Sequence, residues 1–156
     1  MIAYAFYKAF EAPRADWTDR LIAKWTKGPY SHVEIIIDGY MYSSSPRDGG
    51  VRRKKHRVDM TTWDYILIPE NQINEKIILD FFKMTNNAKY DWLGIAGFVI
   101  PVHDNEQKYF CSEWTSKAGA LAGIKCLYNK NFARLSPNKL ARVLKEEGKY
   151  ESIGES

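Results

Sequence analysis

The feature that most constrains the fold is a hairpin signal in the first third of the chain. Residues 33–37 are β-branched except for Glu34, and residues 40–44 resume an extended pattern after the dipeptide Asp38-Gly39. Asp-Gly is favoured in two-residue hairpin turns because both central positions take a positive φ. We therefore expect an antiparallel sheet in which strands follow one another along the chain.

Other segments extend this sheet and add helices. Further strands are expected at residues 4–10, 51–58 and 63–68, and helices at 17–25 (capped by Asp16), from about 74, at 90–99, at 112–122 and after Ser136-Pro137. The 156 residues suit one domain, 1–156, with a polar tail from about residue 147 that is expected to fray. The predicted fold class is α+β, an antiparallel sheet packed against helices.

The net charge of +4 includes one basic run, Arg52-Arg53-Lys54-Lys55-His56-Arg57. Such a run attracts polyanions, and an anionic polymer or nucleic acid is the partner it indicates. The alternative is a solvated hairpin whose alternate residues point to water. Charge by itself favours this alternative.

Targeting signals are not evident in the sequence. Residues 1–8 predict a strand rather than a signal peptide, and the longest apolar stretch, 92–102, is too short to span a bilayer. We expect a cytoplasmic protein with no transmembrane segment. Cys111 and Cys126 are then expected to be free thiols.

Cys111 lies where the helix at 112–122 is expected to start. A helix N-terminus carries partial positive charge and free backbone N–H groups, which favour a thiolate and form an oxyanion hole. The alternative is a buried structural cysteine, and the sequence spacing favours neither interpretation over the other. Cys126 has no comparable setting and is expected to be structural.

His32 is placed at the start of the 33–37 strand, on a rigid element suited to a general base. Glu34, two residues on, projects from the same face and is placed to orient the imidazole. A surface histidine beside a surface glutamate is the alternative. His56 and His103 are expected to face solvent.

Metal and cofactor motifs are not found in this sequence. It contains no CxxC or HExxH spacing and neither of the glycine-rich phosphate loops GxxxxGK[ST] and GxGxxG. The sequence predicts neither a metal site nor a cofactor.

Several segments together resemble the circularly permuted NlpC/P60 family, including YiiX-like proteins and proteins of tailed bacteriophages. The resemblance covers nearly the whole chain, through Tyr30-Ser31-His32-Val33-Glu34, residues 42–52, residues 89–94, Tyr109-Phe110-Cys111-Ser112-Glu113-Trp114 and Leu135-Ser136-Pro137. It implies a permuted papain-like fold in which the histidine strand precedes the cysteine helix. It also implies a thiol hydrolase with Cys111 as nucleophile and His32 as general base.

The third catalytic residue departs from the family pattern. Relatives commonly carry a polar or acidic group on the next strand, which here holds Tyr42, Ser43 and Ser44. Glu34 is therefore our candidate for the orienting residue, with Ser43 behind it. Glu113 is expected to be a structural residue of the first helical turn. The predicted substrate-binding residues are Tyr30, Ser43, Ser112 and Arg52.

The implied chemistry is acyl transfer at an amide or ester bond. Peptidoglycan peptides, isopeptides and acyl lipids are the substrates that the resemblance implies, with a peptidoglycan peptide first. A phage-encoded member would act in the host cytoplasm or in the virion. Two alternatives stay open: a non-catalytic basic module that binds nucleic acid, and a structural phage component on the same fold.

Overall fold

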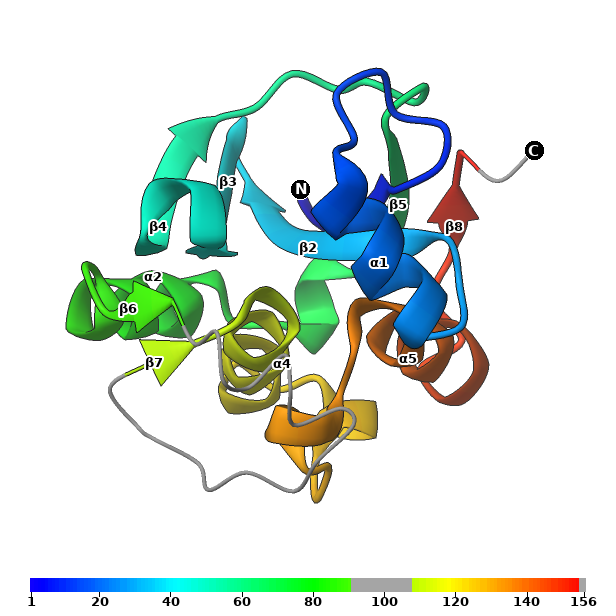
Figure 1. Ribbon diagram of the computed structural model, residues 1–156. Coiled ribbons are helices and arrows are strands. Elements are labelled where there is room, and N and C mark those ends of the chain that lie inside the picture. Colours follow the sequence, from blue (N-terminus) through cyan, green and yellow to red (C-terminus); the bar gives the residue numbers. More distant parts are fainter. Residues whose placement is uncertain (91–107, 155–156) are drawn as a thin grey trace.

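A computed structural model describes residues 1–90 and 108–154. Its sheet has the strand order β7-β6-β4-β3-β2-β1-β5-β8 (Figure 1), and its pairs are antiparallel except β6 with β7. The strands are β1 (Ile2–Lys8), β2 (Tyr30–Ile37), β3 (Tyr40–Ser45), β4 (Gly50–Lys55), β5 (Trp63–Ile68), β6 (Lys89–Tyr90), β7 (Lys108–Tyr109) and β8 (Ser152–Ile153).

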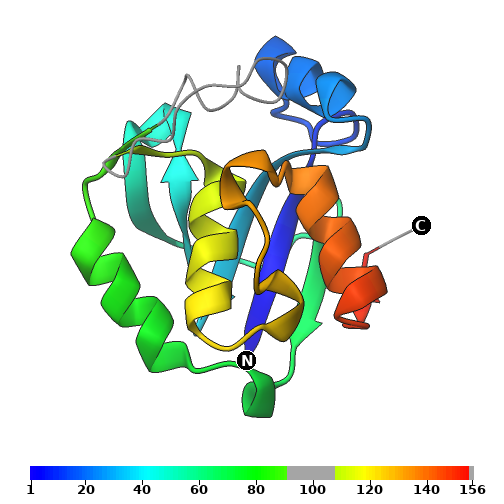
Figure 2. The ribbon, with the colours of Figure 1, turned by 90° about the horizontal axis from the view of Figure 1, so that it is seen from below.

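The helices are α1 (Trp17–Trp25), α2 (Glu75–Thr85), α4 (Cys111–Leu121) and α5 (Pro137–Arg142), the last continued by a π-helical turn, Val143–Glu147. Single 3-10 turns occur at Pro46–Asp48, Glu70–Gln72, Lys125–Leu127 and Phe132–Arg134. Figure 2 shows α2, α4 and α5 side by side against one face of the sheet, the inner face, with α1 apart from them at one end. The α+β class predicted from the sequence is confirmed.

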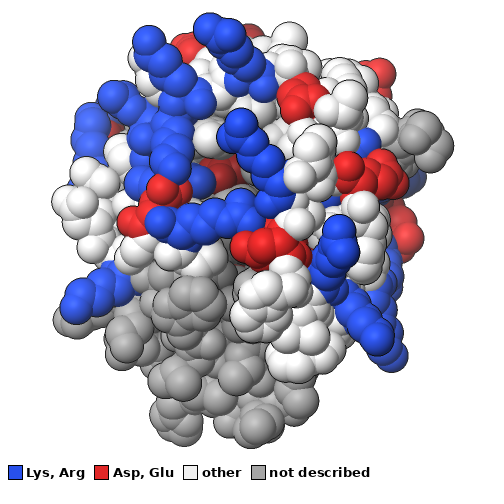
Figure 3. Space-filling model, turned by 45° about the horizontal axis from the view of Figure 1, so that its top comes forward, with Lys and Arg blue, Asp and Glu red and all other residues white. Residues whose placement is uncertain are grey.

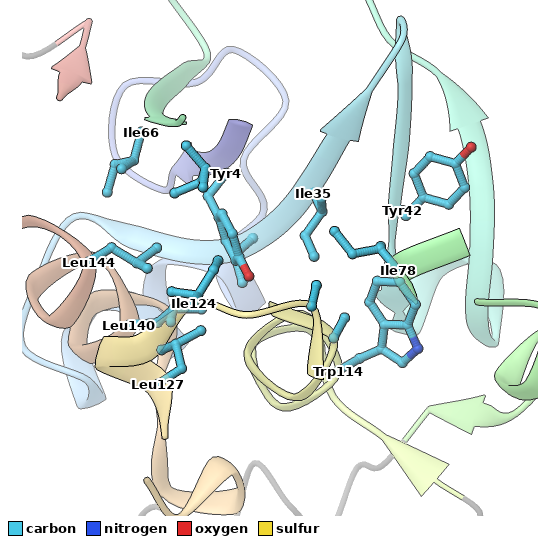
Figure 4. Close-up of a cluster of buried hydrophobic side chains, with 14 of the residues drawn as sticks. Tyr4, Ile35, Tyr42, Ile66, Ile78, Trp114, Ile124, Leu127, Leu140 and Leu144 are labelled. Carbon is cyan, nitrogen blue, oxygen red and sulfur yellow. The ribbon is translucent and has the colours of Figure 1, made fainter. Parts of the chain in front are cut away.

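The core lies between this inner face and the three helices (Figure 4). Strand residues alternate between faces, so every second side chain of β1 and β2 enters the core. The fully buried strand side chains Tyr4, Phe6 and Ile35 pack with Trp114 and Leu140 from the helices. Apolar burial of this kind is the main force that holds helices to the sheet.

Local signals in the sequence fix several element ends as predicted. Asp38 and Gly39 have φ values of 47° and 75°, and Ile37 pairs with Tyr40 across the turn. The Asp16 carboxylate accepts a hydrogen bond from the backbone N–H of Asp19 at 3.0 Å, which caps α1. These contacts satisfy the geometry that each turn or cap requires.

The ladder between β2 and β3 is short. It joins Ile35 with Tyr42, Ile36 with Met41 and Ile37 with Tyr40, although both strands continue beyond these pairs. Tyr30 and residues 32–34 of β2 pair with β1, and residues 43–45 of β3 pair with β4. β2 and β3 are therefore unpaired at the end of the hairpin opposite the Asp38-Gly39 turn.

Some elements differ from the expectation. The basic strand ends at Lys55 rather than at residue 58, and Ser152 and Ile153 form β8 by pairing with Ile66 and Tyr65. The chain after residue 147 is thus held against the sheet edge as far as β8. The expected helix at 90–99 and the loop at 103–108 lie almost wholly outside the described residues.

Candidate active site

His32 and Glu34 point from the same face of β2, as the strand period predicts. The ring Nε2 of His32 lies 2.7 Å from Oε1 of Glu34, within hydrogen-bonding distance. This is the outer face of the sheet, because the alternate residues Val33 and Ile35 enter the core. Glu34 therefore occupies the position expected of a group that orients the imidazole.

Arg52 of β4 holds Glu34 from the other side. Its two terminal nitrogens donate to the two carboxylate oxygens at 2.7 and 2.6 Å, in a bidentate pair. The Glu34 side chain is only 1% exposed, so a charged carboxylate needs such partners. Arg52 Nε also donates to Asp48 at 2.8 Å, and Lys54 pairs with the same Asp48 carboxylate.

These contacts shift two acid–base equilibria. Burial raises the pKa of Glu34, but the charges of His32 and Arg52 and their hydrogen bonds outweigh it and lower this pKa to about 2. Burial lowers the pKa of His32, but its interactions with Cys111 and Glu34 outweigh that and raise this pKa to about 9. His32 is thus protonated near neutral pH.

Cys111 is the first residue of α4 and is buried, with 3% of its surface exposed. The Cys111 side chain lies close enough to the His32 ring to raise the pKa of the imidazole. Since Glu34 binds Nε2, the nitrogen left for the sulfur is Nδ1. The structure therefore brings Cys111, His32 and Glu34 together, with the imidazole between the thiol and the carboxylate.

The two side chains come from different layers of the fold. Cys111 belongs to the helix layer on the inner face, whereas His32 projects from the outer face. α4 contacts both β2 and β3. His32 lies on the part of β2 beyond the last β2–β3 pair, Ile35 with Tyr42.

The first turn of α4 is fixed by its own hydrogen bonds. Glu113 Oε2 accepts from the backbone N–H of Phe110 at 3.4 Å, in keeping with the structural role predicted for it. The Thr115 hydroxyl donates to the carbonyl of Cys111 at 2.9 Å, and the Trp114 indole donates to the Thr85 hydroxyl at 2.8 Å. These contacts hold the backbone on which the thiol is mounted.

A pocket of about 680 Å³ opens on the outer face beside this site. His32, Glu34 and Arg52 line it, together with residues of the β1–α1 segment, the Pro46–Asp48 turn and the β4–β5 loop. Cys111 is not part of the described lining. Figure 3 shows Lys and Arg side chains around this hollow and acidic side chains within it.

A second charged cluster stands in the wall of the pocket. Arg47 donates to Asp19 at 2.6 Å and to Asp16 at 3.2 Å, and Asp19 also accepts from the Ser31 hydroxyl at 2.9 Å. This cluster joins α1 to β2 and to the Pro46–Asp48 turn. Sequence reasoning missed it, because no local signal pairs residues about 30 positions apart.

Aromatic rings form another part of the surroundings. The Trp63 ring lies 5.1 Å from Tyr7, 6.3 Å from His32 and 5.9 Å from His56, measured between centroids. His56 Nε2 also lies 3.0 Å from the Tyr65 hydroxyl. The expectation that His56 faces solvent is therefore wrong: it is half-buried, and burial lowers its pKa.

Three of the predicted substrate-binding residues do not reach the pocket wall. Tyr30 is buried, with its hydroxyl donating to Asp64 at 2.7 Å and its backbone bound by the Asn138 side chain. Ser43 and Ser112 are fully buried. Arg52 is the one of the four that lines the pocket.

The basic run is partly neutralised by neighbouring groups. Arg52 and Lys54 form ion pairs with acids, and the Arg53 guanidinium lies 4.7 Å from the centre of the Tyr40 ring. Alternate side chains thus take opposite faces, as the solvated-hairpin interpretation predicts. Lys55 and Arg57 remain exposed.

Cys111 and Cys126 are both free, as expected. Within residues 1–90 and 108–154, no cluster of three or more His, Cys, Asp or Glu side chains is arranged to hold a metal ion. No helix in those same ranges is long and apolar enough to cross a membrane. His103 lies outside the described residues.

Comparison with known proteins gives no relative from which a role can be transferred. No protein-family model matches the chain, and no curated protein is significantly similar to it. The geometry of Cys111, His32 and Glu34 therefore carries the functional interpretation.

Proposed function

We propose that the protein is a cysteine-nucleophile hydrolase or acyltransferase that acts on an amide or ester bond. The observation that carries the proposal is the position of His32, whose ring contacts the Cys111 side chain on one side and Glu34 on the other. A nucleophile, a base and an orienting acid in that order are the parts that thiol acyl transfer needs.

The first half of the reaction starts from the Cys111 thiolate beside the protonated imidazole of His32, the state that the end of each cycle restores. The sulfur then attacks the carbonyl carbon, and the carbonyl electron pair moves onto oxygen. Backbone N–H groups at the start of α4 stabilise this oxyanion. The carbonyl re-forms as the bond to the leaving amine or alcohol breaks, and His32 returns the proton to that leaving group.

In the second half, the acyl group is held as a thioester on Cys111. Neutral His32 takes a proton from water, or from an acceptor amine or alcohol, as that oxygen or nitrogen attacks the thioester. The carbon–sulfur bond breaks and the sulfur leaves as a thiolate beside the newly charged imidazole. The enzyme is then ready for another cycle.

Arg52 acts on this site through Glu34. Its bidentate pair keeps the carboxylate charged and fixes its oxygens, one of which receives the imidazole hydrogen bond. Arg52 is thus a positioning residue. Arg52 thereby holds an orienting acid on the same strand as the histidine, whereas the family pattern has that group on the next strand.

The fold proposed for this chemistry is the permuted papain-like arrangement of NlpC/P60 proteins. The element order supports it, since the histidine strand β2 precedes the cysteine helix α4 in the chain. The pocket contains charges of both signs, which suits a polar substrate such as a peptidoglycan peptide or an isopeptide. An acyl lipid is the other substrate class within the proposal.

Thiol alkylation tests the proposal, with Cys126 as an internal control in the same chain. Iodoacetamide should label Cys111 at least about tenfold faster than Cys126 near neutral pH, and His32→Gln should remove most of that difference. Mass spectrometry of the intact protein and its peptides measures both rates. Equal labelling of the two thiols, or no effect of His32→Gln, would contradict the proposed pair.

Acyl-enzyme trapping tests the chemical step itself. p-Nitrophenyl acetate should release nitrophenol in a burst and leave an acetyl group on Cys111. Cys111→Ala should abolish the burst, and Cys126→Ser should leave it unchanged. Acetylation found on Cys126 or on lysines instead of Cys111 would overturn the assignment of the nucleophile.

A further inference from the structure

Two segments that line the pocket also carry large apolar side chains that are exposed to solvent. The segments are residues 10–17, from the end of β1 to the first residue of α1, and residues 56–62, between β4 and β5. Trp17 is 75% exposed and Val58 is 72% exposed, and Phe10 and Met60 are 57% and 42% exposed. We call these four residues the apolar rim.

The two segments form one surface, because Lys8 ties them together. Its ammonium group donates to the carbonyl of Met60 at 2.9 Å and pairs with Glu11 at 3.3 Å. Its backbone N–H donates to the carbonyl of Thr62 at 3.0 Å. Both segments also line the pocket, through Arg14 on one side and Asp59 on the other.

Cations accompany the apolar rim. Arg14, Arg20, Lys55 and Arg57 are all exposed on or beside the two segments. Each of the three acids in these segments has a partner: Glu11 pairs with Lys8, Asp16 pairs with Arg47, and Asp59 accepts hydrogen bonds from Thr61 and Thr62. The side that faces the viewer in Figure 3 accordingly shows Lys and Arg side chains around the hollow.

Tryptophan and long aliphatic side chains flanked by Lys and Arg are the combination that partitions into a lipid interface. The indole ring suits the headgroup level, and basic residues are attracted to anionic headgroups. A soluble polyanion would use the cations but gain nothing from four exposed apolar side chains. We propose that the apolar rim docks the protein on an anionic lipid surface, with the mouth of the pocket facing the headgroups.

This surface is independent of the thiol chemistry, so it is tested on the Cys111→Ala protein. Co-sedimentation with vesicles of phosphatidylglycerol and phosphatidylcholine (1:1) should show binding at low salt that weakens as salt rises. Vesicles of pure phosphatidylcholine should bind much less. Collisional quenching by brominated lipid should reach Trp17 and be lost in Trp17→Ala.

Variants separate the apolar and basic contributions. Trp17→Ala with Val58→Ser should weaken binding to the mixed vesicles at least about tenfold, because a large apolar side chain no longer leaves water. Arg14→Gln with Arg57→Gln should weaken it about 25-fold, roughly fivefold for each charge, with no effect on phosphatidylcholine. The matched controls Tyr128→Ala and Lys125→Gln change exposed residues outside both segments and should bind as the parent does.

Two results would overturn the inference. One is no binding to the mixed vesicles at low salt. The other is binding to vesicles and to soluble polyphosphate with equal affinity and without loss in Trp17→Ala with Val58→Ser. Because Cys111 is absent from the protein used, neither result bears on the proposed acyl transfer.

Discussion

The two faces of the sheet differ in what they do with neighbouring residues of one strand. On the inner face, Val33 and Ile35 of β2 join an apolar core under α2, α4 and α5. On the outer face, His32 and Glu34 form a charged network with Arg52. One strand thus contributes to both the core and the candidate site, because its successive side chains point to opposite faces of the sheet.

The faces are coupled at one place. Cys111 belongs to the inner layer but contacts His32 of the outer network, where the β2–β3 ladder has ended. Substitutions in the inner-face core should therefore change the free energy of unfolding of the whole fold. Substitutions on the outer face should change the charges of the network and the pH dependence of stability.

The largest effect is expected from the inner face. Trp114 is fully buried and its ring lies 5.5 Å from that of Phe81. Trp114→Ala removes a large apolar side chain and leaves a cavity, so the free energy of unfolding should fall by about 3–5 kcal/mol. Urea denaturation measures this. A loss below about 1 kcal/mol would mean that α4 does not pack on the sheet as described.

A buried ion pair on the outer face should give the next largest effect. Glu34→Gln leaves the Arg52 guanidinium without its buried partner. We expect the free energy of unfolding to fall by about 3 kcal/mol. This is the lower end of the range for buried pairs, because Arg52 keeps its ion pair with Asp48. Adding Arg52→Met to Glu34→Gln should restore part of the loss. If the two single variants and the double variant are additive, the pair is not coupled.

The same network predicts how stability depends on pH. The pKa of Glu34 is lowered from 4.5 to about 2, so its contribution is complete above pH 4.5 and is lost as pH falls through 2, about 3 kcal/mol at most. The pKa of His32 is raised from 6.5 to about 9, so its contribution is complete below pH 6.5 and is lost as pH rises through 9. Urea midpoints across pH 2–10 should show this window in the native protein and a weaker acid limb in Glu34→Gln.

The smallest effect is expected at the edge of the network. Lys54 pairs with Asp48, but about half of its side chain is exposed. Lys54→Gln should therefore change the free energy of unfolding by less than about 1 kcal/mol. A larger loss in thermal or urea unfolding would show that Asp48 depends on Lys54 to hold Arg52, and so that the network extends to the surface.

Features with local signals were predictable from the sequence. Asp38-Gly39 specifies its own turn, Asp16 caps its own helix, and the spacing of His32 and Glu34 places both on one face. The thiol at the start of a helix was equally visible. In each case the physical cause lies within a few residues.

The features that sequence reasoning missed depend on pairing between distant segments. The bond from Arg52 to Glu34 requires the registers of β2, β3 and β4, and the contact between His56 and Tyr65 requires the path of the loop before β5. The short β2–β3 ladder has no local sequence signal at all. β8 was missed because this two-residue strand lies in a polar tail and is ordered by its pairing with β5.

The central claim is that the imidazole of His32 shares its proton with the sulfur of Cys111. Its most direct test is an NMR titration of the histidine rings in the native protein and in Cys111→Ala, with His32 assigned by the variant His32→Gln. We expect a pKa of about 9 for His32 in the native protein and a lower value once the thiol is removed. Titration near 6.5, or a value that is unchanged in Cys111→Ala, would contradict the account.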